Sequence, residues 1–196
     1  MKTYSDEYQD VFILKYLGQT GFFLDIGCSD GLSNNNTKLL EENGWKGVGI
    51  DKSDDIEKCK KNRNFAHLFK IDACDSSLIR KSLKQAECPK LIDYISLDID
   101  ENSLVCLKSL PLQEYEFRIM TFEHDIYSNR KDCIERKQMA APFLKNFGYE
   151  LLIENIKCKS GPYEDWFAHH KEIQLINKFR NIKNKTGQEI LNLYEQ

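Results

Sequence analysis

The stretch FFLDIGCSDG, residues 22–31, is the part of the chain that best indicates its fold. Its apolar half predicts a buried strand over residues 21–26, and Gly27 and Gly31 frame a turn into a helix expected over residues 34–43. Small residues at such a turn let the backbone approach a ligand at the carboxyl end of a parallel sheet. The stretch therefore predicts a cofactor loop after the first strand.

A short apolar run followed by an amphipathic stretch recurs along the chain, which is typical of a parallel sheet alternating with helices. We predict one domain, residues 1–196, of the α/β class: a doubly wound, Rossmann-like sheet, mostly parallel, with an antiparallel C-terminal strand. A leading helix is expected over residues 4–17 and a frayed polar tail over residues 183–196. The remaining expected strands are 46–51, 65–71, 91–99, 115–122, 149–157 and, after a turn at Gly161-Pro162, 163–168; the remaining helices are 53–61 (capped by Ser53), 76–85, 103–110, 131–147 and 171–180.

Composition excludes several classes of protein. Of the 196 residues, 41% are hydrophobic, which excludes an intrinsically disordered chain. A net charge of −3 argues against nucleic-acid binding, which usually brings a large basic excess. The sequence has no apolar run of membrane-spanning length and no secretory signal, so we expect no membrane partner. Its seven cysteines are odd in number and include no C-x-x-C pair, which favours free thiols in a reducing cytoplasm.

The glycine spacing of the loop separates two classes of cofactor. Dinucleotide-binding proteins need G-x-G-x-x-G, whereas this chain has G-x-S-x-G at Gly27, Ser29 and Gly31. The preceding Asp25 would repel a pyrophosphate but suits the cationic amino end of S-adenosylmethionine (SAM). We therefore predict SAM as the cofactor, bound by these four residues. A carboxylate that only caps local amides is the structural alternative for Asp25.

Two further acids follow the next two strands. Asp51 ends the second strand, 20 residues after Gly31, where a carboxylate can accept hydrogen bonds from both ribose hydroxyls. Proteins that bind nicotinamide cofactors also have an acid at this position, so Asp51 does not distinguish between the two classes of cofactor. Asp72, beside Ala73, follows the third strand and can reach an adenine amino group. Each acid alone could be an ordinary loop residue, but three at successive strand ends favour a cofactor site.

Taken together, these segments resemble the FkbM-type branch of class I SAM-dependent methyltransferases. That branch has a leading Q-x-D-like helix, D-I-G-A-x-x-G, S-N-T…L-E…G-W-x-G with an acid closing the second strand, L-S-L-D-V-E-G and E-D-W. The corresponding positions, in order and over about residues 8–170, are Tyr8-Gln9-Asp10, Asp25 to Gly31, Asn35-Asn36-Thr37, Leu40-Glu41, Gly44-Trp45-Lys46-Gly47, Asp51, Ile95 to Glu101 and Glu164-Asp165-Trp166.

The chain departs from the family pattern at three positions. Cys28 stands where the family has Ala, and Asp100 shortens a Glu by one methylene. Glu101 replaces a Gly, which could disturb a tight turn or crowd the pocket. This last change motivates the alternative of an inactive SAM-binding relative.

Titratable residues converge where the fourth and fifth strands end. Asp98 and Asp100 follow one strand, and Glu123, His124 and Asp125 follow the other, on the same edge of the sheet. A sugar hydroxyl is a poor nucleophile, so we expect His124 or Asp98 to act as general base. The carboxylates also resemble the oxygen ligands of Mg²⁺, with Asp98, Glu123 and Asp125 as candidates. The alternative is that these groups only cap a helix and hydrogen-bond within loops.

The function expected from these residues and the resemblance is a SAM-dependent O-methyltransferase. The resemblance implies a small-molecule acceptor hydroxyl, on a sugar or glycan. A nucleic-acid methyltransferase is an alternative, disfavoured because the D/N-P-P-Y/W segment of the amino-group enzymes is absent after the fourth strand. A non-catalytic SAM-binding or scaffold protein is a second alternative.

Overall fold

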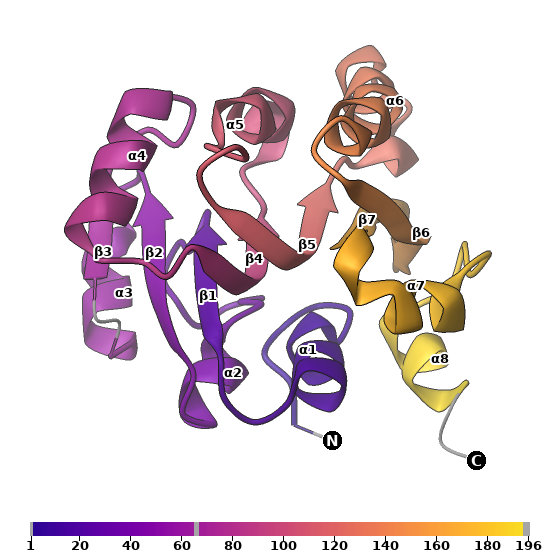
Figure 1. The fold of residues 1–196 in the computed structure, drawn as a ribbon, viewed down its shortest axis with the longest axis horizontal. Helices are drawn as coiled ribbons and strands as arrows, with labels where there is room; N and C mark the ends of the chain where they lie inside the picture. Colours follow the sequence, from indigo (N-terminus) through magenta and orange to yellow (C-terminus); the bar gives the residue numbers. More distant parts are fainter. Residues whose placement is uncertain (1, 65–66, 194–196) are drawn as a thin grey trace.

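The computed structural model describes residues 2–64 and 67–193. In those residues seven strands form one sheet in the order β3–β2–β1–β4–β5–β7–β6 (Figure 1). Strands β1 to β5 pair in parallel, and β7 lies antiparallel between β5 and β6. The prediction of a mostly parallel α/β sheet with an antiparallel C-terminal strand is confirmed. The strands are β1 Phe22–Ile26, β2 Lys46–Asp51, β3 His67–Lys70, β4 Leu91–Leu97, β5 Glu116–Glu123, β6 Tyr149–Cys158 and β7 Gly161–His169.

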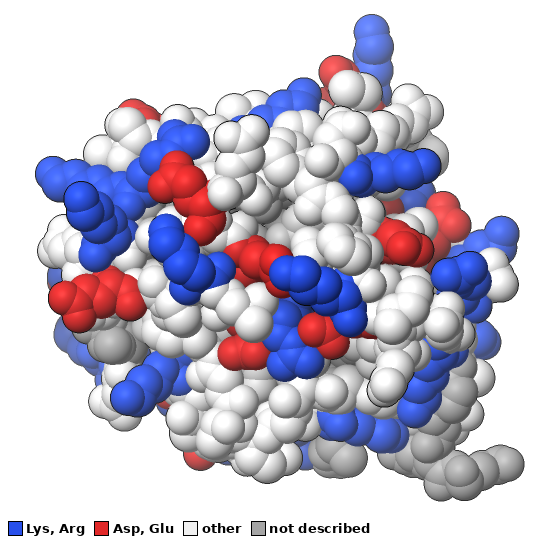
Figure 2. All heavy atoms as spheres, in the orientation of Figure 1, with Lys and Arg blue, Asp and Glu red and all other residues white. Residues whose placement is uncertain are grey.

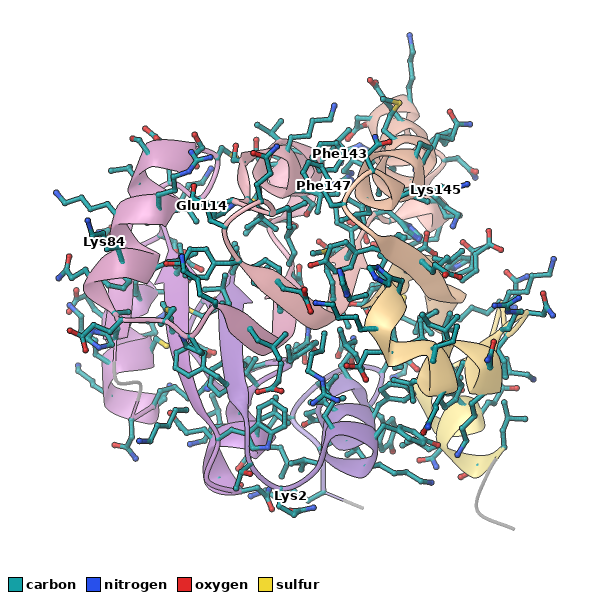
Figure 3. All side chains as sticks on the ribbon, viewed as in Figure 1. Lys2, Lys84, Glu114, Phe143, Lys145 and Phe147 are labelled. Carbon is teal, nitrogen blue, oxygen red and sulfur yellow. The ribbon has the colours of Figure 1, made fainter. Side chains whose placement is uncertain are left out.

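Helices cover both faces of the sheet (Figure 1). Helices α4, α5 and α6 pack on one face, and α1, α2, α7 and α8 on the other. The ring of Phe143 on α6 lies 5.2 Å from that of Phe147, which follows the end of this helix (Figure 3). The helices are α1 Gln9–Leu17, α2 Lys38–Glu42, α3 Ile56–Asn62, α4 Ser76–Gln85, α5 Ser103–Ser109, α6 Lys131–Lys145, α7 Ile173–Phe179 and α8 Gly187–Asn192.

Strand β1 shows why a continuous apolar run forms the centre of the sheet. Its successive side chains alternate between the two faces, so Phe23 joins the cluster beneath α1 and α2 while Leu24 and Ile26 join the cluster beneath α4 and α5. All three are fully buried. A strand buried on both sides is mostly apolar, as is usual in parallel sheets, and the one charged residue of β1, Asp25, is buried among polar partners.

Helices α1 and α2 begin later than expected, because side chains compete for the backbone at their starts. Helix α1 begins at Gln9 rather than near residue 4, since the Asp10 carboxylate accepts hydrogen bonds from Thr3 Oγ1 and the Tyr4 amide and holds that segment as a loop. Helix α2 begins at Lys38 rather than 34, because Asn35 and its neighbours turn inward to polar partners.

Other boundaries also differ from the prediction. The C-terminal tail is not frayed throughout: Thr186 caps α8 through a capping box, and Ile190 on that helix is fully buried. Ser53 does not cap α3, since its amide donates to Asp51 and the helix begins at Ile56. Gly161-Pro162 opens β7 instead of forming the turn before it. The expected start of the third strand, at residues 65–66, lies outside the described residues.

Two further predictions, on the cysteines and on membrane-spanning segments, can be compared with the structure. All seven cysteines are free thiols. Among the described residues, no helix combines the length and apolar character needed to cross a bilayer.

Candidate functional site

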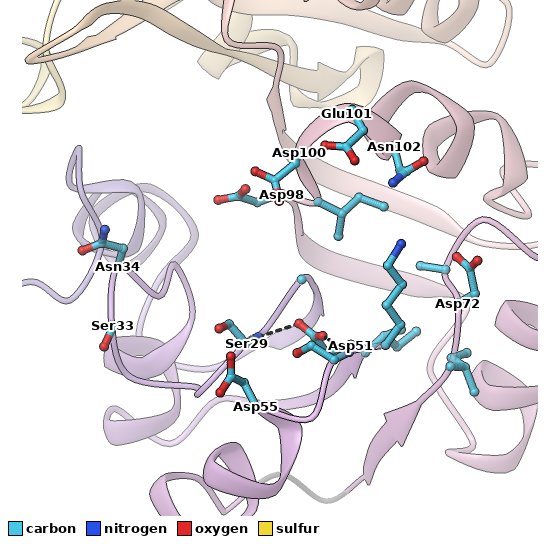
Figure 4. Close-up of a pocket in the computed structure, with 17 residues that line it drawn as sticks. Ser29, Ser33, Asn34, Asp51, Asp55, Asp72, Asp98, Asp100, Glu101 and Asn102 are labelled. Carbon is cyan, nitrogen blue, oxygen red and sulfur yellow. Dashed lines mark hydrogen bonds between the residues drawn. The ribbon is translucent and has the colours of Figure 1, made fainter.

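The strand order reverses between β1 and β4, and a cavity of about 430 Å³ opens at the carboxyl ends of these strands. Open α/β sheets bind ligands at such a switch point. Figure 4 shows residues that line the cavity, which come from the ends of β1, β2, β3 and β4 and the loops after them; the acidic ones belong to β2, β3 and β4. The lining residues are Gly27, Ser29, Ser33, Asn34, Ile50, Asp51, Lys52, Ser53, Asp55, Ile71, Asp72, Ala73, Asp98, Ile99, Asp100, Glu101 and Asn102.

Gly27 fixes the shape of the loop after β1. Its φ is +88°, and a Cβ atom placed on it would lie 1.7 Å from the carbonyl oxygen of Asp98. The Gly27 amide donates to the carbonyl of Ile50 at 2.9 Å, which ties the loop to β2. Only glycine fits here, because a side chain would push the loop away from β4.

Asp51 organises the floor of the cavity. Its carboxylate accepts hydrogen bonds from the amides of Ser29 at 2.8 Å and of Ser53 at 2.7 Å (Figure 4). It therefore joins the loops after β1 and β2. A carboxylate offers about four acceptor sites, so Asp51 retains lone pairs for ribose hydroxyls.

The structure brings five of the seven predicted cofactor residues to this cavity: Gly27, Ser29, Asp51, Asp72 and Ala73. Asp25 and Gly31 lie outside its lining.

Asp25 is buried behind the loop. Its carboxylate accepts hydrogen bonds from Thr37 Oγ1 at 2.7 Å and Asn35 Nδ2 at 3.0 Å, with Arg63 Nη1 3.8 Å away. Burial raises the pKa of Asp25, while the Arg63 guanidinium and these hydrogen bonds oppose the rise. Asp25 therefore holds residues 34–37 against the sheet. This position agrees with the alternative in which its carboxylate only makes local hydrogen bonds. Its contact with SAM stays a prediction.

Gly31 also supports the loop from behind. Its φ is +73°, and a Cβ atom there would meet Cys59 Sγ and Arg63 Cγ at 2.6 Å. The glycine is therefore needed for packing of the loop on α3.

A second cavity, of about 210 Å³, adjoins the first. The two share Asn34 and Asp98 in their linings, so Asp98 faces both spaces. A cofactor in the larger cavity and an acceptor in the smaller one would meet beside this carboxylate. The other residues that line the second cavity are Asp6, Gln9, Asn36, Glu123, Asp125, Tyr127, Cys158 and Tyr163.

Asp98 and Glu123 form a carboxyl pair at the ends of β4 and β5. They share a side-chain hydrogen bond, and the Glu123 carboxylate also accepts from the Asp100 amide at 3.3 Å. Burial raises the pKa of Asp98 to about 6, and burial with the adjacent Asp98 charge raises the pKa of Glu123 further. Two carboxyl groups this close cannot both ionise, so the pair holds one proton near neutral pH.

The residues predicted to hold Mg²⁺ do not fit that role. Asp98 and Glu123 bind each other, and Asp125 lies 3.9 Å from the guanidinium of Arg136, which is itself buried. Over residues 2–64 and 67–193, no three His, Cys, Asp or Glu side chains are arranged to hold an ion. The shared proton and the guanidinium relieve the repulsion among these acids.

His124 lies behind the cavities, outside both linings. Its side chain is fully buried, with Nε2 3.4 Å from Asp165 Oδ1, and its Nδ1 accepts a hydrogen bond from the Ile126 amide at 3.3 Å. Asp165 in turn binds Lys137. Its role as general base stays a prediction, and the structure places it where it can position the turn after β5.

Glu101 replaces a glycine of the family pattern and motivated the alternative of an inactive SAM-binding relative. Its side chain is exposed at the rim of the larger cavity. The left-handed position of this turn is Asp100, with φ +54°, whereas Glu101 is not among the residues with positive φ. The turn therefore forms without a glycine at position 101.

Sequence reasoning missed the network that anchors the N-terminal segment to the site. Gln9 Nε2 donates to Tyr163 Oη and, at 3.1 Å, to Glu164 Oε1. Trp166 Nε1 donates to the same carboxylate oxygen. Burial raises the pKa of Glu164 to about 8. The sequence offered one signal of this contact. The Q-x-D-like segment and the E-D-W segment lie far apart in sequence, but both belong to the family pattern.

Comparison with known proteins supports the fold. No family model matches the sequence, and no curated protein matches it. Among solved structures, a candidate O-methyltransferase from Klebsiella pneumoniae aligns with a TM-score of 0.57 and 10% identity, over 82% of this chain and 79% of that one. The ribosomal protein L11 methylase from Lactobacillus delbrueckii subsp. bulgaricus aligns with a TM-score of 0.53 and 14% identity, over 82% and 76%.

A third similar structure is that of WbdD, with a TM-score of 0.52 and 16% identity. The alignment covers 82% of this chain but only 33% of that one, so the chain spans a third of that protein. Identities this low show the fold alone. The fold is Rossmann-like and matches that of the methyltransferases in these structures.

Proposed function

We propose that the protein is a SAM-dependent O-methyltransferase of the FkbM type that acts on a hydroxyl of a sugar or glycan. The observation that carries the proposal is the position of Asp98, which faces both the cavity at the switch point and the smaller cavity beside it. A methyl donor and an acceptor placed in these two spaces would meet at its carboxylate. The FkbM assignment and the sugar rest on the sequence motifs.

The charge of the larger cavity favours SAM over a dinucleotide. Its lining includes the carboxylates of Asp51, Asp55, Asp72 and Asp100 and, among the described residues, one lysine, Lys52. A pyrophosphate would be repelled by this set, whereas a cofactor with sulfonium and ammonium charges would be attracted. Asp51 would hold the ribose and Asp72 would reach the adenine amino group.

Asp98 has the properties of a general base in this arrangement. Bound SAM would supply an electrophilic methyl group on a sulfonium sulfur. With the shared proton on Glu123, the Asp98 carboxylate is ionised near neutral pH and takes the proton from the acceptor hydroxyl as its oxygen is methylated. No metal ion enters the proposal, because the carboxyl groups that would bind one are engaged with each other and with Arg136.

A nucleic-acid acceptor is disfavoured by charge. Figure 2 shows Lys and Arg interspersed with Asp and Glu over the face drawn, without a continuous basic surface. Nucleic-acid binding relies on such a surface. We therefore propose a small-molecule or glycan acceptor and, from the free cysteines, action in a reducing compartment such as the cytoplasm.

The test is methyl transfer to a panel of sugars and polyols, followed by mass spectrometry of the acceptor and of the demethylated cofactor product. The proposal expects a methylated acceptor with the unaltered protein and loss of the product with Asp98→Asn. SAM binding without transfer to any hydroxyl acceptor would favour the inactive SAM-binding relative instead.

A further inference from the structure

The second cavity has an acidic lining with an unpartnered polar atom directed into it. It contains the carboxyl groups of Asp6, Asp98, Glu123 and Asp125, and its described lining includes no Lys, Arg or His. Resting on the proposed function, we propose that this cavity takes an acceptor with a protonated amine near the hydroxyl that is methylated, such as an amino sugar.

The charges in this cavity are only partly compensated. Asp98 and Glu123 share a proton, and Asp125 faces Arg136 at 3.9 Å. Asp6, exposed at the mouth, makes no ion pair or side-chain hydrogen bond with any residue that the structure describes. Negative charge therefore remains in the cavity and at its mouth, which a cationic ligand would neutralise.

Asn36 supplies an independent sign of a ligand. Its side chain is 4% exposed, and its Nδ2 donates to Ser96 Oγ at 3.0 Å. That hydrogen bond orients the amide so that its carbonyl oxygen, which has no partner among the described residues, remains as an acceptor beside the cavity. This oxygen is not one of the buried polar atoms sealed from solvent, so it is open to the cavity that Asn36 lines, where a donor on the ligand would pair with it.

The lining is thus rich in acceptors and poor in donors. Gln9 Nε2 is already used by Tyr163 and Glu164, which removes one of the few amide donors. Hydroxyl and ammonium groups of a ligand would find carboxylate and amide oxygens, whereas a phosphate would find repulsion. The exposed ring of Tyr127 adds a π-face on which an ammonium can rest.

The size of the cavity limits the acceptor to a small unit. Its volume of about 210 Å³ lies below the range of roughly 300–1,000 Å³ that is usual for pockets holding drug-sized ligands. An aminated monosaccharide, free or at the end of a glycan, fits this limit better than a nucleotide-linked sugar.

The experiment compares three probes of one ring: glucosamine, glucose and glucose 6-phosphate. Each is titrated by saturation-transfer NMR into the full chain at pH 6.5, where an amine of pKa about 8 is protonated. S-adenosylhomocysteine, the demethylated product of SAM, is present to fill the larger cavity. We expect glucosamine to bind about 10-fold more tightly than glucose, and glucose 6-phosphate to bind more weakly than glucose.

Two variants connect the preference to the cavity. Asp6→Asn, at an exposed position, should weaken glucosamine by about threefold and leave glucose unchanged. Asp54→Asn, an exposed acid outside both linings, should change neither. Raising the salt concentration should reduce the preference for glucosamine, because partly exposed charges are screened.

Equal binding of glucosamine and glucose, tightest binding of the phosphate, or no sugar binding in the presence of bound S-adenosylhomocysteine would overturn the inference. Failure of the proposed function has a different signature: either S-adenosylhomocysteine does not bind, or it binds and SAM methylates no hydroxyl acceptor. The charge preference of the second cavity can be measured in either case.

Discussion

The backbone of Gly27 packs directly against the carbonyl of Asp98, so closely that a Cβ atom would come within 1.7 Å of that oxygen. This contact joins the loop that would hold a methyl donor to the strand end that carries the candidate base. The spacing between cofactor and base therefore depends on a residue without a side chain.

Gly27→Ala should abolish SAM binding and destabilise the fold. Gly44→Ala is the matched control, since Gly44 has φ +93° and open space around its Cβ position. Both changes incur left-handed strain of about 1–2 kcal/mol, but only Gly27→Ala adds a clash worth roughly 1–3 kcal/mol. Thermal denaturation and SAM titration measure the difference. Equal losses in the two variants would show that the contact with Asp98 is unimportant.

Asp98→Asn should lower turnover by roughly 10²–10⁴-fold while SAM affinity changes little, because the amide cannot take the acceptor proton. His124→Ala should instead destabilise the protein by about 2–5 kcal/mol, since it leaves a cavity in place of a fully buried ring. Kinetics and urea unfolding of both variants separate the two roles. If His124→Ala loses turnover and keeps its stability, His124 is the base and Asp98 is not.

Turnover should be unaffected by EDTA. The reason is that the three carboxyl groups already have partners within the protein. Asp98 and Glu123 share a proton, and Asp125 faces Arg136. Assays with EDTA, and with EDTA followed by excess Mg²⁺, provide the measurement. Activity that disappears with the chelator and returns with Mg²⁺ would restore the metal hypothesis.

Stability should fall as pH rises from about 4.5 toward 8, in part because of Glu164. Burial raises the pKa of this residue from 4.5 to about 8, so between these values the folded state holds a proton that the unfolded state has lost. Its stabilising contribution is complete below the unfolded pKa and is lost as pH rises through the folded one, with a slope of up to about 1.4 kcal/mol per pH unit. Glu164→Gln should flatten the profile, measured by urea unfolding at several pH values. An unchanged slope in the variant would show that a group other than Glu164 causes the pH dependence.

The sequence predicted the sheet well because apolar periodicity directly reflects burial. The five-residue run of β1, with Phe23 facing one layer and Leu24 the other, has no other stable place than the centre of a parallel sheet. Asp51 and Asp72 reach the same cavity for the same reason, whereas Asp25 lies behind the loop. Once strand direction is known, the carboxyl ends of parallel strands must share an edge.

The details that sequence reasoning missed depend on side-chain contacts between distant segments. Asn35 and Thr37 belong to no periodic pattern of apolar residues. Their hydrogen bonds to Asp25 nevertheless delay the start of α2 to Lys38. Similarly, the tail is polar in composition, but the cap at Thr186 and the burial of Ile190 form α8 against α1. Whether an acid such as Asp25 faces a cavity or a buried amide depends on packing that a local pattern does not contain.

The most direct test of the account is calorimetric titration of SAM, S-adenosylhomocysteine and NAD into the unaltered protein and into Asp51→Ala, with Asp54→Ala as the matched control. Asp51 ends β2 and Asp54 lies in the loop after it, but of the two only Asp51 lines the larger cavity. The account predicts micromolar binding of SAM and its product, none of NAD, and a loss of about 1.5–3 kcal/mol, or about 10- to 150-fold, only in Asp51→Ala. Binding of NAD without binding of SAM would contradict it.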